Sequence, residues 1–210
     1  METPAQKLYP LHPSQNTLHI SELAAGGSLA VRESNIIGFT LTVREETHSS
    51  EAIADALEKA MNHFVRTNDT LRLRFVHSAT GWKQYIAPWE YTVIDRMAVT
   101  DEKTFAAYMN KTYVGRPYWK KECVWIGRIG LLPKNGAVLA LRVSHFVFDG
   151  YSFSLAHRRI REAYSAYLRG EEPADKPAPS IAACRRVTPL MLPRHNSKPT
   201  VPTGKKLTPP

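Results

Sequence analysis

A histidine, an aspartate and a glycine lie close together near residue 145, in an order that suits proton-transfer chemistry. The stretch reads Ser144-His145-Phe146-Val147-Phe148-Asp149-Gly150. The ordinary pKa of histidine is about 6.5, so neutral imidazole is available near pH 7 to accept a proton. Such a base is needed when an amine or a hydroxyl group attacks an acyl thioester. We therefore take His145 as the candidate base.

Asp149 has two possible roles, and the sequence leaves both open. Its carboxylate can orient the imidazole of His145, as the acid does in hydrolytic triads. Alternatively, it points away from the ring and forms an ion pair that fixes the turn. Gly150 permits a positive φ angle and the close approach of a substrate to the backbone. A solvated turn without chemistry is the remaining alternative, because short motifs also arise by chance.

The segments around this motif predict how His145 is held. The apolar, β-branched run over residues 137–144 predicts a buried strand that ends at the histidine. Asn135-Gly136, just before it, is a strong hairpin signal and predicts pairing with a strand over residues 122–131. Residues 152–169 have helical spacing and end at Gly170, a candidate helix cap. We expect His145 at the end of a strand, directly before a helix.

The rest of the chain predicts helices that alternate with short strands. Residues 48–66 give the clearest helix, with Ser49 or Ser50 as its cap and one apolar face. The other expected elements are a helix over 13–23, strands over 35–43, 71–77, 82–86 and 91–94, and a helix from 101 to about 114. This order predicts a layered α/β domain of hairpins and helices.

The composition excludes several classes of protein. The 210 residues are 43% hydrophobic, which supports one globular domain with a sizeable core. No apolar run approaches the roughly 18 residues of a transmembrane helix, and residues 1–10 lack the pattern of a secretory signal. The net charge of +9 forms no basic stripe with interleaved aromatic residues, so no nucleic acid partner is expected. Cys123 and Cys184 lack metal-ligand spacing, which favours a reducing, cytoplasmic location.

Three separated regions together resemble the N-terminal lobe of a condensation domain of nonribosomal peptide synthetases, within the chloramphenicol-acetyltransferase-like superfamily. Leu11-His12-Pro13-Ser14-Gln15 resembles the opening motif of the family. Asn68-Asp69-Thr70-Leu71-Arg72-Leu73-Arg74-Phe75 is similar to its second motif. The segment from Ser144 to Ser152 resembles its third, usually His-His-x-x-x-Asp-Gly. The resemblance runs from about residue 8 to about residue 172, in the order of the family.

The resemblance implies a fold and a reaction. The implied fold is an α/β (α+β) sandwich, one chloramphenicol-acetyltransferase-like lobe over residues 1–172 with a mixed sheet and helices packed on it. Nine of the fifteen prolines fall in the last 40 residues, so we expect an extended or disordered tail over residues 173–210. The implied reaction is amide bond formation between thioester substrates on carrier proteins, with His145 as the catalytic residue. The substrates would be held on the phosphopantetheine of the carriers, with no cofactor or metal bound by this chain.

Departures from the family pattern keep other functions open. Ser144 stands where the family has the first histidine of its pair, and Thr67, Asn68 and Asp69 replace Arg, His and Glu. Arg72 is retained, and the resemblance implies that it pairs with Asp149 to hold the loop. The family builds its tunnel between two lobes, so a second lobe or another subunit must supply the other wall. The alternatives are a non-catalytic, truncated or degenerate lobe that binds a carrier or partner, and an acyltransferase that uses acyl-CoA.

Overall fold

A four-stranded mixed sheet is the centre of the molecule. The computed structural model describes residues 7–24, 36–113 and 123–180. Within them, the sheet has the order β2-β7-β6-β5, with bounds Ile36–Arg44, Gly136–Ser144, Trp125–Leu132 and Arg96–Ala98. β5 runs parallel to β6, whereas β7 is antiparallel to both of its neighbours. The expected hairpin of β6 and β7 is confirmed.

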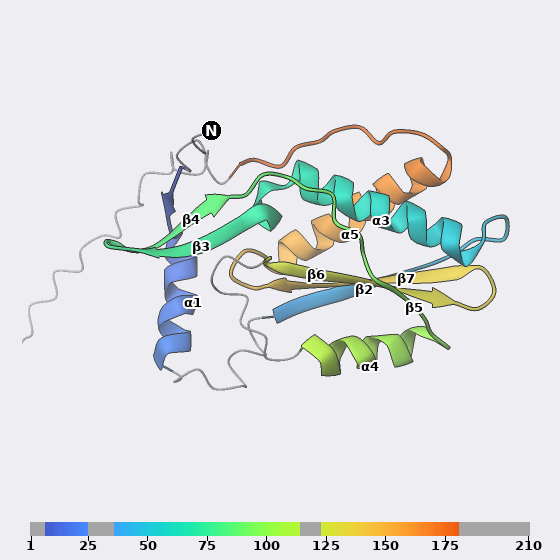
Figure 1. Ribbon diagram of the computed structural model, residues 1–210, viewed down its shortest axis with the longest axis horizontal. Helices are drawn as coiled ribbons and strands as arrows, with labels where there is room; N and C mark the ends of the chain where they lie inside the picture. The colour runs from blue at the N-terminus through green and yellow to red at the C-terminus, as the bar shows by residue number, and fades with distance from the viewer. Residues whose placement is uncertain (1–6, 25–35, 114–122, 181–210) are drawn as a thin grey trace, which may run out of the picture.

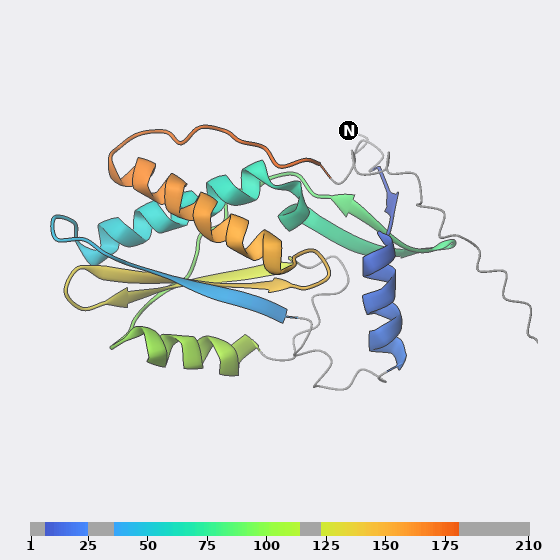
Figure 2. The same ribbon diagram turned by 180° about the vertical axis from the view of Figure 1, so that it is seen from behind.

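Helices cover both faces of this sheet (Figures 1 and 2). α3 (Ser50–Thr67) and α5 (Gly150–Leu168) lie on one face, and α4 (Glu102–Tyr113) lies on the other. β7 is therefore buried on both sides, and eight of its nine residues are buried. A strand covered on both faces must be apolar at nearly every position, as this one is. The predicted α/β sandwich with a mixed sheet is confirmed.

A second, three-stranded sheet and helix α1 form one end of the molecule (Figure 1). β1 (Tyr9–Pro10), β4 (Gly81–Ile86) and β3 (Leu73–Ser78) are joined in the order β1-β4-β3, and α1 spans Pro13–Ala24. The strands expected over residues 71–77 and 82–86 correspond to β3 and β4, which pair as an antiparallel hairpin. The predicted strand over residues 71–77 begins later, because residues Asp69–Arg72 form a 3₁₀ helix, η1.

The turn between β6 and β7 differs in detail from the sequence pattern. Lys134 and Asn135 have positive φ angles of 58° and 53°, so these two residues are the centre of the turn. Gly136 already belongs to β7 and faces Leu132 of β6. Positive φ angles suit the twist of a tight hairpin, and asparagine tolerates such an angle well. The Asn-Gly pair therefore predicted the hairpin correctly but lies one residue past its centre.

Helix α3 begins and packs as its sequence predicts. Ser49 is its cap, and its Oγ accepts a hydrogen bond from the Ala52 N–H at 3.2 Å. Its apolar face is fully buried at Ile53, Leu57 and Met61. These side chains lie four positions apart and so form one stripe, which packs against the sheet and α5.

The strand expected over residues 91–94 is wrong, because side chains of α3 take the place of a neighbouring strand. Thr92 N–H donates to Asn62 Oδ1 at 2.8 Å, and the Asn62 amide donates back to the Thr92 carbonyl at 2.9 Å. Ile94 N–H donates to Glu58 Oε2 at 3.1 Å. The backbone is satisfied in this way without joining a sheet.

Glu58 carries much of this attachment although it is almost completely buried. It is 7% exposed. Its two oxygens also accept from the Tyr91 hydroxyl at 2.9 Å and from Arg96 at 3.3 Å. Burial of the hydroxyl and its bond to Glu58 raise the pKa of Tyr91 to about 12, although half of that residue is exposed. A buried carboxylate with three donors thus ties the linker before β5 to α3.

Residues 171–180, here called the strap, return along α3 and α5 without regular secondary structure (Figures 1 and 2). Gly170, with φ of 73°, ends α5 and turns the chain back. Ala178 N–H donates to the Thr67 carbonyl at 2.9 Å, and Arg159 donates to the Lys176 carbonyl at 2.8 Å. The described part of the expected tail is therefore extended and bound to the helices; residues 181–210 lie outside the described part. No described helix is long and apolar enough to span a bilayer.

Candidate functional site

The three motif regions meet at one pocket of roughly 270 Å³. Helix α1 contributes its first turn, the start of β3 contributes a second wall, and the turn after β7 contributes a third. The residues that line it are His12, Ser14, Gln15, Leu18, Thr70, Leu73, His145, Phe146, Val147, Phe148, Asp149 and Ser152. Segments more than 130 positions apart in sequence thus share one cavity, and His145 is among them.

One hydrogen bond fixes both the ring of His145 and the position of its proton. Nδ1 lies 2.7 Å from the carbonyl oxygen of Phe148. A carbonyl oxygen only accepts, so Nδ1 must carry the hydrogen. In the neutral ring Nε2 then has a lone pair and no proton. The structure therefore presents His145 with its outer nitrogen as a proton acceptor.

Backbone bonds and buried aromatic rings hold the turn in place. Ser144 is 8% exposed, and its N–H donates to the Val124 carbonyl at 2.8 Å. Its Oγ accepts from the Phe146 N–H at 3.3 Å. The ring of Phe146 packs edge-on against Phe75 of β3, with centroids 5.3 Å apart. Ser144, the neighbour in the motif, thus supports the turn and does not line the pocket.

Asp149 caps helix α5 and does not orient the imidazole. Its Oδ1 accepts from the N–H of Ser152 at 2.8 Å and from the Ser152 hydroxyl at 2.7 Å. These bonds, the backbone one first, lower the pKa of the Asp149 carboxyl. The triad role is therefore not formed, since Phe148 and not Asp149 receives the Nδ1 hydrogen of His145.

The expected pair of Arg72 with Asp149 is also not formed, although the structure describes both residues. Arg72 instead donates to the Ala87 carbonyl at 3.5 Å, and its Nε is buried without a described partner. The carboxylate of Asp149 is instead hydrogen-bonded to Ser152, only three positions away, as the cap of α5. Arg72 therefore contacts the backbone that follows β4 and not the loop that carries Asp149.

Gly150 does not use the conformational freedom expected of it. Positive φ angles among the described glycines occur at Gly81 and Gly170, not at Gly150. A Cβ atom added at Gly150 would meet nothing within 4 Å. Gly150 is the first residue of α5 and leaves open space beside the Asp149 cap.

We expect the replacement of Asp149 by alanine to lower the free energy of unfolding by about 1 kcal/mol, because α5 loses its cap. Asp149→Ser keeps a capping oxygen and should lose less than half of that. In a double-mutant cycle measured by urea denaturation, the changes in unfolding free energy caused by Asp149→Ala and by Arg72→Ala should add. A coupling energy above roughly 0.5 kcal/mol would contradict the separation of the two side chains.

Gln15 and Gln84 brace the first turn of α1 from beneath the pocket. They are 4% and 2% exposed, and their side-chain amides exchange two hydrogen bonds of 3.0 Å. Gln15 Oε1 also accepts from the His12 N–H at 2.6 Å, and the Gln84 amide donates to the Pro10 carbonyl at 3.0 Å. The sequence placed Gln15 in a motif but gave no sign of the contact with Gln84. It also gave no role to His12, although this residue stands in the same motif.

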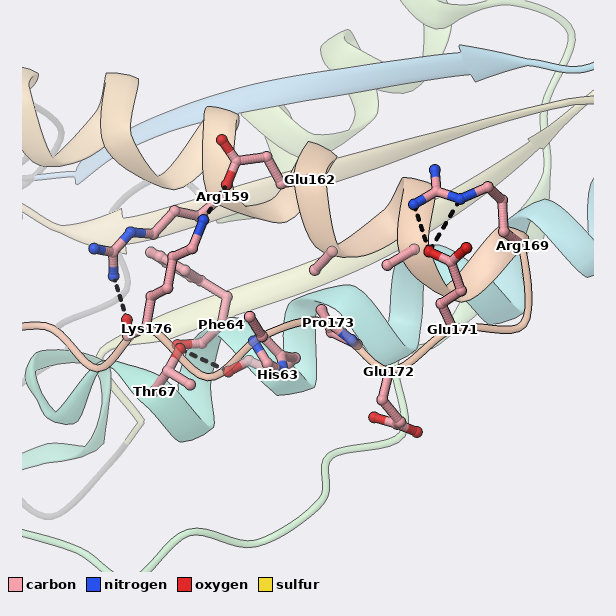
Figure 3. A pocket seen from close by; sticks show the side chains of 13 residues that line it. His63, Phe64, Thr67, Arg159, Glu162, Arg169, Glu171, Glu172, Pro173 and Lys176 are labelled. Carbon is pink, nitrogen blue, oxygen red and sulfur yellow. Dashed lines mark hydrogen bonds and ion pairs between the residues drawn. The ribbon is translucent and has the colours of Figure 1, made fainter.

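A second pocket of roughly 320 Å³ lies between α3, α5 and the strap (Figure 3). Its lining includes apolar side chains, such as Phe64 and Pro173, and charged side chains of both signs. The rim charges pair with one another, as in Arg169 with Glu171 at 2.7 Å and Lys176 with Glu162 at 3.7 Å. None of the site residues expected from the sequence lines this pocket.

His63 lies beneath the strap, and its surroundings predict that the stability of the fold depends on pH. Burial chiefly, then the charge of Arg66, lowers its pKa, while Asp175 and Glu172 oppose that shift. The unfolded chain therefore binds a proton more readily than the folded one. The contribution of His63 to the free energy of unfolding should be fully present above pH 6.5 and should decrease as the pH falls below that value.

The measurement is urea denaturation at pH 7.5 and pH 5.5. His63→Gln should lose less stability between these two pH values than the unaltered chain. His77→Gln, a change at an exposed histidine of β3, should keep the original dependence. An unchanged slope in His63→Gln would show that the dependence has another origin.

Known proteins resemble this chain in sequence and in fold. The family model of the condensation domain matches residues 5–182. The nonribosomal peptide synthetase kk1B of Curvularia clavata is 30% identical over 129 residues, which are 60% of this chain and 1% of that protein. The starter condensation domain of rhizomide synthetase RzmA has a TM-score of 0.67 at 21% identity, over 85% of this chain and 42% of that one.

The fold is similar to a second kind of domain as well. The X-domain from teicoplanin biosynthesis has a TM-score of 0.66 at 20% identity, over 87% of this chain and 37% of that one. This chain thus spans less than half the length of the domains whose structures it matches. The coverage agrees with the expected N-terminal lobe. Since the family model matches well over half of its residues, the chain belongs to the condensation domain family.

Proposed function

We propose that this chain takes part in condensation-type acyl transfer, in which an amine attacks a carrier-bound thioester to form an amide, with His145 as the base. The observation that carries the proposal is the bond from His145 Nδ1 to the Phe148 carbonyl at 2.7 Å. It leaves the Nε2 lone pair in a pocket built from all three motif regions. A fixed, neutral imidazole is the usual acceptor for the proton that an attacking amine must lose.

The bonds and protons of this step balance between the two substrates, with His145 as the carrier of the proton. The amine nitrogen bonds to the thioester carbon, and the carbon–sulfur bond breaks. His145 Nε2 takes a proton from the amine and returns one to the departing thiolate. The products are an amide and a thiol, and no oxidant or metal takes part.

The same proposal includes the carrier proteins and the part of the pocket wall that this chain does not supply. Substrates would arrive on the phosphopantetheine of carrier proteins in the cytoplasm. A second lobe or another subunit would close the pocket, since the chain corresponds to 42% of the matched starter condensation domain.

The test is a reconstituted transfer with the full chain. An acyl-loaded donor carrier and an aminoacyl-loaded acceptor carrier are mixed with it, and intact-mass spectrometry follows the acceptor. We expect the acyl group to appear on the acceptor only when the chain is present. Carrier binding without transfer, by the same chain purified as a folded protein, would favour a non-catalytic lobe. Transfer from acyl-CoA but not from a carrier would favour the small-molecule acyltransferase.

A further inference from the structure

A second histidine, His12, lines the pocket of His145. Its hydrogen bonds place the ring hydrogen on Nε2, whereas that of His145 is on Nδ1. His12 precedes helix α1, is exposed, and is among the residues that line the pocket. The N–H of Ser14 donates to His12 Nδ1 at 3.4 Å, and the Ser14 hydroxyl lies 2.8 Å from the same atom. A backbone N–H only donates, so Nδ1 of His12 is an acceptor and has no hydrogen. The hydrogen of the neutral ring is then on Nε2.

The backbone of His12 is held as firmly as its ring. Its N–H donates to Gln15 Oε1 at 2.6 Å, and Gln15 is in turn bonded to Gln84 of β4 within the core. The position of His12 is therefore set by the packing of α1 on the small sheet. A pocket side chain held by its own backbone and by one ring nitrogen presents its other nitrogen in a defined place.

We infer that His12 is the hydrogen-bond donor of the pocket and binds the carbonyl oxygen of an acyl thioester through Nε2–H. His145 presents an acceptor at Nε2, and His12 presents a donor at Nε2. The reacting pair has the matching groups, an amine that gives up a proton and a carbonyl oxygen that gains negative charge. A donor aimed at this oxygen stabilises the charge as it develops.

The inference rests on the proposed function for its substrate, but not for its geometry. In the described part of the chain, His12 Nε2 has no protein partner, so the N–H is available to a ligand. The balance of the step is unchanged, because His12 donates a hydrogen bond and keeps its proton. Its role is to bind and polarise the carbonyl group while His145 moves the proton.

The proton positions can be read directly by long-range ¹H–¹⁵N spectra of the full chain with ¹⁵N-labelled histidine. At a pH where the rings are neutral, we expect Nε2–H at His12 and Nδ1–H at His145. His12→Phe and His145→Asn variants assign the two signals. An Nδ1–H form of His12 would overturn the inference whether or not the chain shows any transfer.

The contact is tested with acetyl-N-acetylcysteamine thioester, which carries the carbonyl group without a carrier protein. Its addition should shift the Nε2 signal of His12 together with that of His145, and should leave His77 on β3 unmoved. A shift at His145 alone would contradict a contact with His12. Because this readout needs no turnover, a chain that transfers nothing refutes the proposed function and leaves the binding result intact.

Measurements of turnover in two variants then show whether His12 acts as a hydrogen-bond donor or has only a structural role. His12→Phe keeps a ring but has no donor, and should lower kcat/KM at least about tenfold. His12→Gln offers an amide N–H at similar reach and should restore activity to within about threefold of the unaltered chain. Equal losses in the two variants, with unchanged urea midpoints, would show that the hydrogen bond is not the cause.

Discussion

Replacement of His145 by alanine should lower the rate of the proposed transfer at least about 100-fold, because a positioned base contributes that much or more. The expected loss is in kcat, since the proton moves in the transition state and substrate binding uses other walls of the pocket. The measurement is the rate of product formation on the acceptor carrier under single-turnover conditions. His77→Ala, at an exposed histidine of β3 outside the pocket, should keep the full rate.

His145→Asn separates the chemistry of the ring from its place in the turn. The asparagine amide can donate to the Phe148 carbonyl, as Nδ1 does at 2.7 Å, but it offers no acceptor at the position of Nε2. The variant should therefore unfold at the same urea concentration as the unaltered chain and still be as inactive as His145→Ala. Activity retained in His145→Asn would contradict a base at Nε2 and would leave only a structural role for this residue.

The elements around His145 could be predicted from the sequence because local patterns determine them. A β-branched run gives β7, and a capped amphipathic pattern gives α5, so the histidine had to lie between a strand end and a helix start. The structure fixes what the pattern left open. Of the two roles weighed for Asp149, neither the triad nor the ion pair is formed, since the carboxylate binds Ser152 in the next turn. A cap of this kind was readable, because aspartate is among the preferred residues at the position just before a helix.

Contacts between distant side chains could not be read from local patterns. The linker around Thr92 has the β-branched composition of a strand, but Asn62, thirty positions earlier, binds both of its polar backbone groups. The pairing of Gln15 with Gln84 likewise joins residues 69 positions apart. His12 was missed for a different reason. Its ring is defined by Ser14, and nothing in a His-Pro-Ser sequence shows which nitrogen carries the proton.

Replacement of Glu58 by alanine should lower the free energy of unfolding by about 3 kcal/mol, more than the loss of a helix cap or of an exposed ion pair. The carboxylate is 7% exposed and accepts from Tyr91, Ile94 and Arg96. Without it the N–H of Ile94, a residue that is 2% exposed, is buried and unpaired. Arg96 keeps Asp55 at 2.7 Å and is not left uncompensated, so the cost lies at the low end for a buried charge. Equilibrium urea denaturation measures the difference.

Two matched variants test whether burial or charge causes this loss. Glu51 also binds Arg96, at 3.2 Å, but its side chain is 64% exposed, so Glu51→Ala should cost no more than about 0.5 kcal/mol. Glu58→Gln keeps the shape and one acceptor oxygen, and should lie between the two, because one of the three donors loses its partner. Equal effects of Glu58→Ala and Glu51→Ala would mean that the ion pair with Arg96 matters and the buried bonds do not. The ordering Glu58→Ala, Glu58→Gln, Glu51→Ala would instead show that a buried carboxylate, and not a strand pairing, fastens residues 91–94 to α3.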